Sequence, residues 1–111
     1  SAFLDLFGDL EYLRTQKEVG ESSWFGFSLI LEEGSPLTRS QVIDVFEQNR
    51  VECRPIVSGN FVKNRSVLEH FDYEVAGSMS NAEYLDTNGL FIGNHHVDVR
   101  NELRELRKLF P

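Results

Sequence analysis

The stretch that decides the fold is WFGFSLIL, residues 24–31, followed by LTRSQVIDVFEQN, residues 37–49. The first segment is short, aromatic and aliphatic, and bounded by turn-forming residues, which predicts a buried β-strand. The second has Thr38 followed three positions later by Gln41, the spacing of a capping box, so we expect a helix to begin there. Its buried face should consist of Val42, Ile43, Val45 and Phe46.

On the N-terminal side, apolar residues recur at helical spacing over the first fourteen positions. They are Phe3, Leu6, Phe7, Leu10 and Leu13. This spacing predicts an amphipathic helix. The polar stretch from Thr15 to Ser23, which contains Gly20, is interpreted as a connector.

Towards the C-terminus, Val51 to Val57 alternates loosely and predicts a second strand, and Pro55 places that strand at a sheet edge. Residues 58–65 are expected to form an exposed loop. A third short strand is predicted at 90–92, followed by a loop at 93–96.

Three further helices are expected after the loop at residues 58–65. Two short ones begin at apparent capping boxes, Ser66 with Glu69 and Ser80 with Glu83. Gly89 is predicted to end the second of them in the left-handed conformation. The last helix should begin at Asp98 and bury a stripe formed by Val99, Leu103, Leu106 and Phe110.

This order predicts an α+β fold, a small antiparallel or mixed sheet of about three strands covered on one face by helices. The chain has 111 residues, enough for one domain with its own core. Its net charge of −7 offers no general attraction to nucleic acid or to an anionic membrane. A lone cysteine excludes a disulfide scaffold and fits a reducing compartment, and no segment resembles a membrane span or signal peptide. We therefore expect a cytoplasmic protein.

Two polar loops follow predicted strands and are the best candidates for ligand contact. Arg54 is followed by Ser58, Gly59 and Asn60, and a guanidinium suits a carboxylate or a phosphate. The alternative is an arginine paired with a nearby carboxylate beside a turn that needs Gly59. The second loop is Gly93-Asn94. If the two strands are neighbours, both loops could emerge at one end of the sheet and form half a binding site.

Other reactive groups are weaker candidates. Cys53 lies within a predicted strand and is interpreted as a small buried hydrophobe rather than a reactive thiol. His95 and His96 are adjacent and would point to opposite sides of an extended backbone, which disfavours a shared metal ion. They could instead be structural, or one could donate a hydrogen bond to a ligand.

The sequence lacks the parts of a complete active site. It contains no glycine-rich phosphate loop and no recognised nucleophile or metal motif. Its lysines, Lys17, Lys63 and Lys108, lie where a desolvated Schiff base is not expected. We accordingly predict no catalytic residue, no cofactor-binding residue and no metal ligand within these residues.

Four segments together resemble one family in order and spacing. They are WFGF at 24–27, Thr38-Arg39, CRPIVSGNF at 53–61 and NAEYLDTNGLFIGNHH at 81–96. The chain resembles the C-terminal small domain of the DegT/DnrJ/EryC1/StrS family, fold-type I pyridoxal phosphate (PLP) sugar aminotransferases and dehydratases. The match covers about residues 15–110 and is nearest the branch with nucleotide-diphosphate 4-keto-6-deoxyhexose 3-dehydratases and perosamine synthases of lipopolysaccharide biosynthesis.

The resemblance implies a division of labour. Pyridoxal or pyridoxamine phosphate and the catalytic base would lie in a larger N-terminal domain, and the intact enzyme would be a homodimer acting on a nucleotide-linked keto-deoxysugar. The segments that match imply substrate contacts at Arg54, Ser58, Gly59, Asn60, Asn94, His95 and His96. Residues 1–20 would connect to the large domain and expose Phe and Leu to it, and residues 21–111 would be the small domain.

Two hypotheses of different classes follow. In the first, the chain is the substrate-side domain of a PLP-dependent aminotransferase or 3-dehydratase, inactive alone, and the sequence does not choose between the two reactions. In the second, it is a free-standing α+β ligand-binding or dimerisation module. A small hydrolase using His95 and His96 is a more distant third.

Overall fold

An antiparallel sheet of four strands organises the chain. The computed structural model describes residues 2–56, 59–95 and 97–111. The strand order is β1-β2-β4-β3, and every neighbouring pair is antiparallel. The strands are β1 (Leu13–Thr15), β2 (Gly26–Leu31), β3 (Cys53–Pro55) and β4 (Gly89–Gly93). The helices are α1 (Ala2–Phe7), α2 (Arg39–Gln48), the 3₁₀ turn η1 (Phe61–Lys63), α3 (Arg65–Leu68), α4 (Ser80–Asn88) and α5 (Arg100–Arg107).

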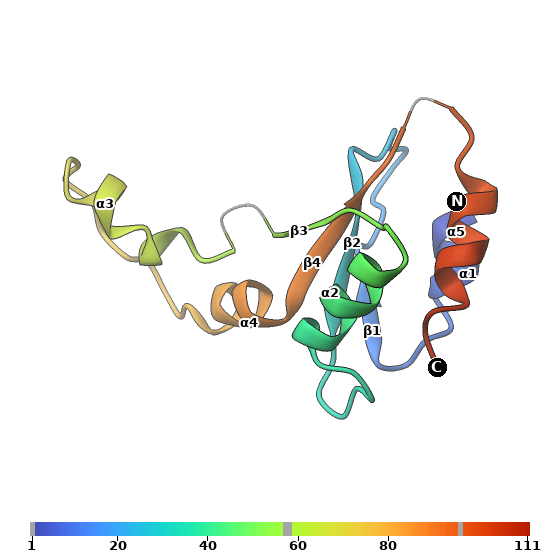
Figure 1. Cartoon of the computed structure of the whole chain (residues 1–111). Helices are drawn as coiled ribbons and strands as arrows, with labels where there is room; N and C mark the ends of the chain where they lie inside the picture. The colour runs from blue at the N-terminus through green and yellow to red at the C-terminus, as the bar shows by residue number, and fades with distance from the viewer. Residues whose placement is uncertain (1, 57–58, 96) are drawn as a thin grey trace.

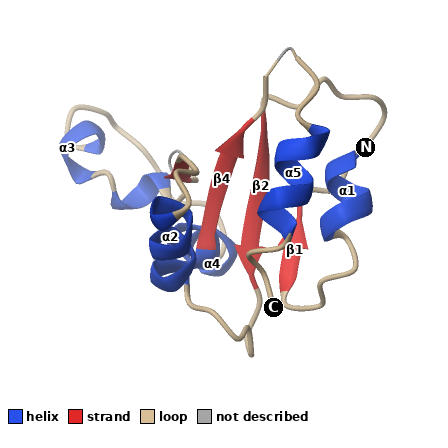
Figure 2. Cartoon of the chain, turned by 45° about the vertical axis from the view of Figure 1, so that its right-hand side comes forward, coloured by secondary structure: helices blue, strands red, loops and turns tan. Residues whose placement is uncertain are grey.

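The two faces of the sheet have different coverings. The face under α1, α2 and α5 carries the apolar side chains of Leu13, Phe27, Leu29, Leu31, Leu90 and Ile92, all buried (Figure 2). The alternating residues face the other side, where α4 covers only the end near Ile30. The α+β prediction is confirmed, with four strands instead of three. Pro55 lies on edge strand β3, as its missing N–H requires.

Helix α2 begins where its sequence predicts. The Gln41 N–H donates to Thr38 Oγ1 at 3.3 Å, and the Thr38 N–H donates to Gln41 Oε1 at 2.8 Å. The capping box therefore satisfies two backbone donors at this helix start. Val42 and Phe46 lie one turn apart and are both buried in the core. Helix α2 is therefore stabilised both by its capping box and by packing against the sheet.

The N-terminal region differs from the predicted helix. Helix α1 ends at Phe7, and Leu13 lies in β1, where it pairs with Leu31. Phe3 and Phe7 are 1% and 0% exposed, so they belong to this chain's own core, and the prediction that phenylalanines on this helix are exposed is wrong. Apolar residues from a helix and a following strand happen to continue one helical spacing, which explains the error. The predicted boundary at residue 20 stays a prediction.

Aromatic packing explains why α1 belongs to the core. The Phe3 ring lies 4.5 Å from that of Phe27 in β2, and the Phe7 ring lies 5.7 Å from that of Phe110 beyond α5. In addition, Arg107 Nε on α5 donates to the Leu6 carbonyl at 2.9 Å. Figures 1 and 2 both place α1 beside α5.

Several helix ends are capped differently from the prediction. Ser66 lies inside α3, and α4 begins at Ser80 itself, so neither serine forms the predicted capping box. Gly89 is extended, with φ −97°, and leads directly into β4. Glycine is needed here for lack of space, because a Cβ would lie 2.6 Å from the Leu85 carbonyl oxygen. Asp98 accepts the Arg100 N–H at 2.9 Å and so stabilises the start of α5. The N-cap residue itself is Val99, one residue after the predicted Asp98.

Candidate functional site

Arg54 lies on the sheet face opposite to the one that α1, α2 and α5 cover. In the β3–β4 register it pairs with Phe91, which in turn pairs with Ser28 of β2. Directly opposed residues share one face of a sheet, so Ser28, Phe91 and Arg54 form one row. The Arg54 Nη2 donates to Glu52 Oε1 at 2.8 Å, and both side chains are largely exposed. The arginine thus has the carboxylate partner of the simpler alternative, yet retains donors that face solvent.

Half-buried Phe91 of this row lies beside an exposed aromatic ring, that of Phe25. Phe25 is 90% exposed, and its ring lies 6.3 Å from that of Phe91. A shallow hollow of about 350 Å³ adjoins the pair and is lined by Gln16, Ser22, Trp24, Phe25, Gly26, Ser28, Ile56 and Phe91. We call Phe25, Ser28, Arg54 and Phe91 the open-face site. The sequence analysis missed its aromatic part, although the position of Phe91 between two inward residues, Leu90 and Ile92, was a usable signal.

Gly59 and Asn60 have structural roles. Gly59 has φ +48°, and a Cβ there would lie 2.3 Å from Asp86 Oδ1, so only glycine fits both the backbone and the space. Asn60 is 4% exposed, and its Oδ1 accepts the Val62 N–H at 3.2 Å to cap η1. These contacts position the start of η1 and do not by themselves indicate a ligand.

Asn94 and His95 belong to a loop that is tied to Trp24. Asn94 Nδ2 donates to the Trp24 carbonyl at 2.9 Å, and its Oδ1 accepts the His95 N–H at 2.9 Å. His95 is exposed, and its Nδ1 accepts the Val97 N–H at 3.3 Å. This hydrogen bond fixes the orientation of the imidazole relative to the loop.

The two predicted loops do not meet. Because β3 and β4 are antiparallel, the residues after Pro55 leave the sheet at the start of β4, near Leu90, while Asn94 follows its end. The expected convergence at one end of the sheet is therefore wrong (Figure 1). Sequence order alone did not say whether these strands run parallel. The predicted contacts at Ser58 and His96 lie outside the described residues.

Cys53 has an environment that suppresses its reactivity. Burial raises the pKa of its thiol, and the nearby carboxylates of Glu47 and Glu52 raise it further. The thiolate is the nucleophile, so its fraction at neutral pH is lower than for a free cysteine. This agrees with the interpretation of Cys53 as a packing residue.

We therefore expect slow alkylation of Cys53 by iodoacetamide at neutral pH. The rate should keep rising with pH beyond the point where a free thiol levels off, because the raised pKa delays ionisation. Glu47→Gln should move the profile to lower pH, and Glu83→Gln, on a different helix, should not. A profile that levels off at the free-thiol value would contradict this.

The described residues include no lysine in a setting suited to a Schiff base. Lys63 Nζ is exposed and pairs with Asp86 at 3.3 Å, Lys108 pairs with Glu105 at 2.7 Å, and Lys17 is exposed. A Schiff-base lysine needs a desolvated setting, which none of these has. Within residues 2–56, 59–95 and 97–111, no cluster of three metal-binding side chains occurs. No helix in this part of the chain is long and apolar enough to cross a membrane.

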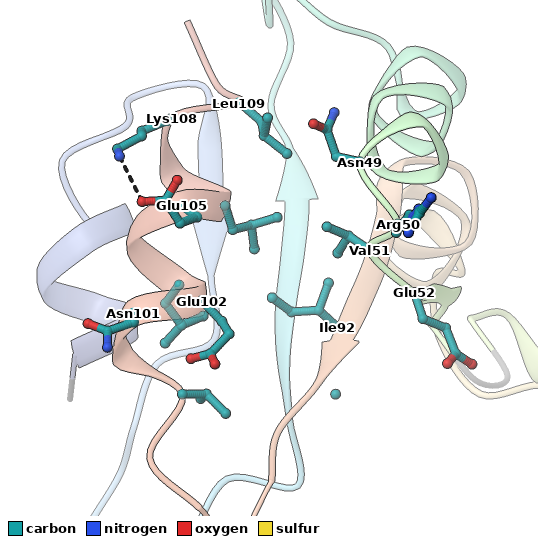
Figure 3. A pocket seen from close by; sticks show the side chains of 14 residues that line it. Asn49, Arg50, Val51, Glu52, Ile92, Asn101, Glu102, Glu105, Lys108 and Leu109 are labelled. Carbon is teal, nitrogen blue, oxygen red and sulfur yellow. Dashed lines mark hydrogen bonds and ion pairs between the residues drawn. The ribbon is translucent and has the colours of Figure 1, made fainter.

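A larger hollow lies on the opposite, helical face. It has a volume of about 670 Å³ and separates α5 from the segment after α2 (Figure 3). Its floor is apolar and consists of Val51, Ile92, Val99, Leu103, Leu106 and Leu109. Its rim is charged, and the Lys108–Glu105 ion pair spans part of it. Arg54 faces the other side of the sheet, so this hollow is separate from the open-face site.

Comparisons with known proteins identify close relatives. The chain is 50% identical over 104 residues to GDP-4-keto-6-deoxy-D-mannose 3-dehydratase of Yersinia pseudotuberculosis, which covers 94% of this chain and 26% of that protein. A solved structure of the Escherichia coli enzyme with bound hydrated PLP superposes with a TM-score of 0.93 at 50% identity, covering 99% of this chain and 28% of that one. A variant of such a dehydratase with bound GDP-perosamine superposes at 0.92, with 51% identity over 97% of this chain and 28% of that one. No family model matches the chain.

Fold and sequence together thus match one part of solved PLP-binding sugar-nucleotide dehydratases, as the resemblance predicts. More particularly, the chain is a homologue of part of the GDP-4-keto-6-deoxy-D-mannose 3-dehydratases. It spans about a quarter of the length of these relatives.

Proposed function

We propose that this chain forms the substrate-side part of a PLP-dependent GDP-4-keto-6-deoxymannose 3-dehydratase. The observation that carries the proposal is 50% identity combined with a TM-score of 0.93 over 99% of the chain. The relatives that share about half of their residues with this chain are 3-dehydratases, which favours dehydration over amination. The proposal includes a cytoplasmic setting, a role in lipopolysaccharide sugar synthesis and a homodimeric intact enzyme.

In this proposal the cofactor supplies the electron sink for chemistry at the keto-sugar, and it binds outside this chain. The residues described here would bind and orient the substrate. Arg54 would offer N–H donors to phosphate oxygens, and the exposed ring of Phe25 with the half-buried ring of Phe91 would offer an apolar surface to a base or a sugar. His95 would contact the substrate at the other end of β4. Asn94, Gly59 and Asn60 would act by holding the two loops in place.

The contacts of Ser58 and His96 remain part of the same proposal as residues carried over from the family motif. The free-standing module has less support, because close relatives contain this fold as about a quarter of a longer enzyme. The hydrolase has less support again, since His95 Nδ1, the position that a general base would use, accepts the Val97 N–H.

A chimera tests the proposed function directly. The corresponding segment of the Escherichia coli dehydratase is replaced by residues 1–111, and PLP absorbance and turnover of GDP-4-keto-6-deoxymannose are measured. We expect PLP binding and turnover within about tenfold of the parent, because the two segments share half their residues and the same fold. A folded chimera that binds PLP but has no turnover would overturn the proposal.

The isolated chain serves as the matched control for that experiment. Residues 1–111 alone should show no internal-aldimine absorbance when mixed with PLP, because each of Lys17, Lys63 and Lys108 is exposed. Stoichiometric absorbance from the isolated chain would contradict this division of labour.

A further inference from the structure

Arg39 occupies a position that its own helix does not favour. It is the first residue of α2, where the positive end of the helix dipole disfavours a cation. Its side chain is half-buried, and its Nη1 donates to the carbonyls of Asp86 and Gly89, at 2.5 and 3.4 Å. Both carbonyls belong to the C-terminal end of α4. The guanidinium therefore serves α4 and not the helix that carries it.

Helix α4 receives its C-terminal cation from this distant residue. The last carbonyls of a helix have no partner within it, and a cation beside them is stabilising. The last turn of α4 contains no basic residue, and Gly89 leads directly into β4. Arg39, which lies 47 residues before Asp86 and 50 before Gly89, supplies the missing donor. We call residues 86–89 the α4–β4 junction, and Arg39 fixes it from α2.

The segment that follows Arg54 packs on this junction at two points. A Cβ on Gly89 would lie 2.7 Å from Ile56 Cγ1, and a Cβ on Gly59 would lie 2.3 Å from Asp86 Oδ1. Real Cβ atoms are not found this close to other heavy atoms, so at each point the two parts approach as near as glycine allows. A shift of the junction would therefore be passed to the segment after Arg54.

The placement of Arg54 needs such support because its strand is weak by itself. β3 has three residues, pairs on one side only, and loses one ladder donor at Pro55. Before the strand, the Val51 N–H donates to the Phe46 carbonyl near the end of α2, at 2.8 Å. After the strand, the support is the packing on the α4–β4 junction. Arg39 thus acts on Arg54 through that junction.

We propose that Arg39 is a positioning residue for substrate binding, because its hold on the α4–β4 junction keeps Arg54 in the row of Phe91 and Ser28. This inference rests on the proposed function, since it assigns Arg39 to the binding step of that reaction. It predicts that Arg39 contributes to substrate binding only while Arg54 is present.

A double-mutant cycle in the PLP-loaded chimera tests this dependence. Arg39→Met removes both hydrogen bonds and keeps the apolar stem. We expect it to raise KM for GDP-4-keto-6-deoxymannose about fivefold, with less than about a twofold change in kcat. In the Arg54→Ala background, Arg39→Met should raise KM by less than about a further twofold. Equal rises in both backgrounds would overturn the proposal, because a purely structural role does not depend on Arg54.

The matched control for Arg39→Met is Arg104→Met. Arg104 Nη1 donates within α5, to Asn101 Oδ1 at 3.0 Å, so its loss should leave KM unchanged. Arg39→Lys should recover part of the KM, because an ammonium still offers a charged donor to the carbonyls but cannot reproduce the guanidinium fork. A KM for Arg39→Lys as high as that for Arg39→Met counts against the proposal.

A second variant keeps the test decisive if Arg39→Met does not fold. Asp86→Ala retains the carbonyl that Arg39 binds and removes the carboxylate that contacts Lys63 and lies against Gly59. Its effect on KM should also depend on Arg54. Glu83→Ala, an exposed carboxylate one turn earlier on α4, is its control and should leave KM unchanged. Effects of Asp86→Ala that are independent of Arg54 would overturn the role of the junction.

Hydrogen exchange followed by mass spectrometry separates this inference from the proposed function, because it needs no turnover. In the folded chimera, peptides that contain Arg54 should exchange about fivefold faster after Arg39→Met and at the parent rate after Arg104→Met. An inactive chimera with this exchange pattern would support the hold of Arg39 on Arg54 and contradict the proposed function. Unchanged exchange after Arg39→Met would overturn the role of Arg39 whatever the turnover.

Discussion

Replacing Phe7 with alanine is expected to lower the free energy of unfolding by about 4 kcal/mol, the loss typical of a fully buried phenylalanine. Phe7 is 0% exposed, stacks at 5.0 Å on Phe3 and meets the ring of Phe110 edge-on. The helix that carries it, α1, has only six residues and is therefore held by packing rather than by its own propensity. Urea titration followed by circular dichroism measures the change.

Phe25→Ala is the matched control for Phe7→Ala. It removes the same side chain from a position that is 90% exposed, so stability should change by no more than about 0.5 kcal/mol. Similar losses for both variants would contradict the placement of α1 in the core. They would restore the original expectation that this helix serves a neighbouring domain.

Arg54→Ala is expected to raise the KM of the active chimera for its GDP-linked sugar by about tenfold or more, since a charge-assisted hydrogen bond contributes roughly 1.5–3 kcal/mol. We expect a smaller change in kcat, because Arg54 is proposed to bind and not to move protons. Arg54→Lys should recover only part of the loss, since an ammonium cannot reproduce the planar fork of a guanidinium. Steady-state kinetics measure both parameters.

Arg14→Ala is the control for charge on the same sheet face. Arg14 is exposed and paired with Glu32 at 2.6 Å, much as Arg54 is paired with Glu52, but it lies in the row of Ile30 and Gly89. Its loss should leave KM unchanged. Equal effects of Arg14→Ala and Arg54→Ala would indicate general attraction of an anionic ligand and would remove Arg54 from the site.

Local signals predicted the central elements well. The apolar run at 24–31 contains β2, and the Thr38–Gln41 box begins α2 because both of its hydrogen bonds form within four residues. The stripe of α5 is also correct, with Leu103, Leu106 and Phe110 buried. In each case the interactions that fix the element lie within the segment itself or follow its periodicity.

Long-range pairing accounts for what the sequence did not predict. β1 has three residues and is stabilised by its register with β2, so nothing in its own composition distinguishes it from the end of a helix. The position of the Arg54 loop relative to Asn94 depends on strand direction, which is set by the whole topology. The alternation along 90–92 indicated an outward Phe91, but its place beside Arg54 follows only from the strand register.

The separation of the two loops along β4 sets a minimum length for any molecule that touches both. β4 has five residues, and at about 3.4 Å per residue its ends are roughly 14 Å apart. A lone monosaccharide or an inorganic phosphate is too short to reach from one end to the other. Under the proposed function, only a ligand at least this long can contact both loops at once, and either half of such a ligand alone would contact one loop only.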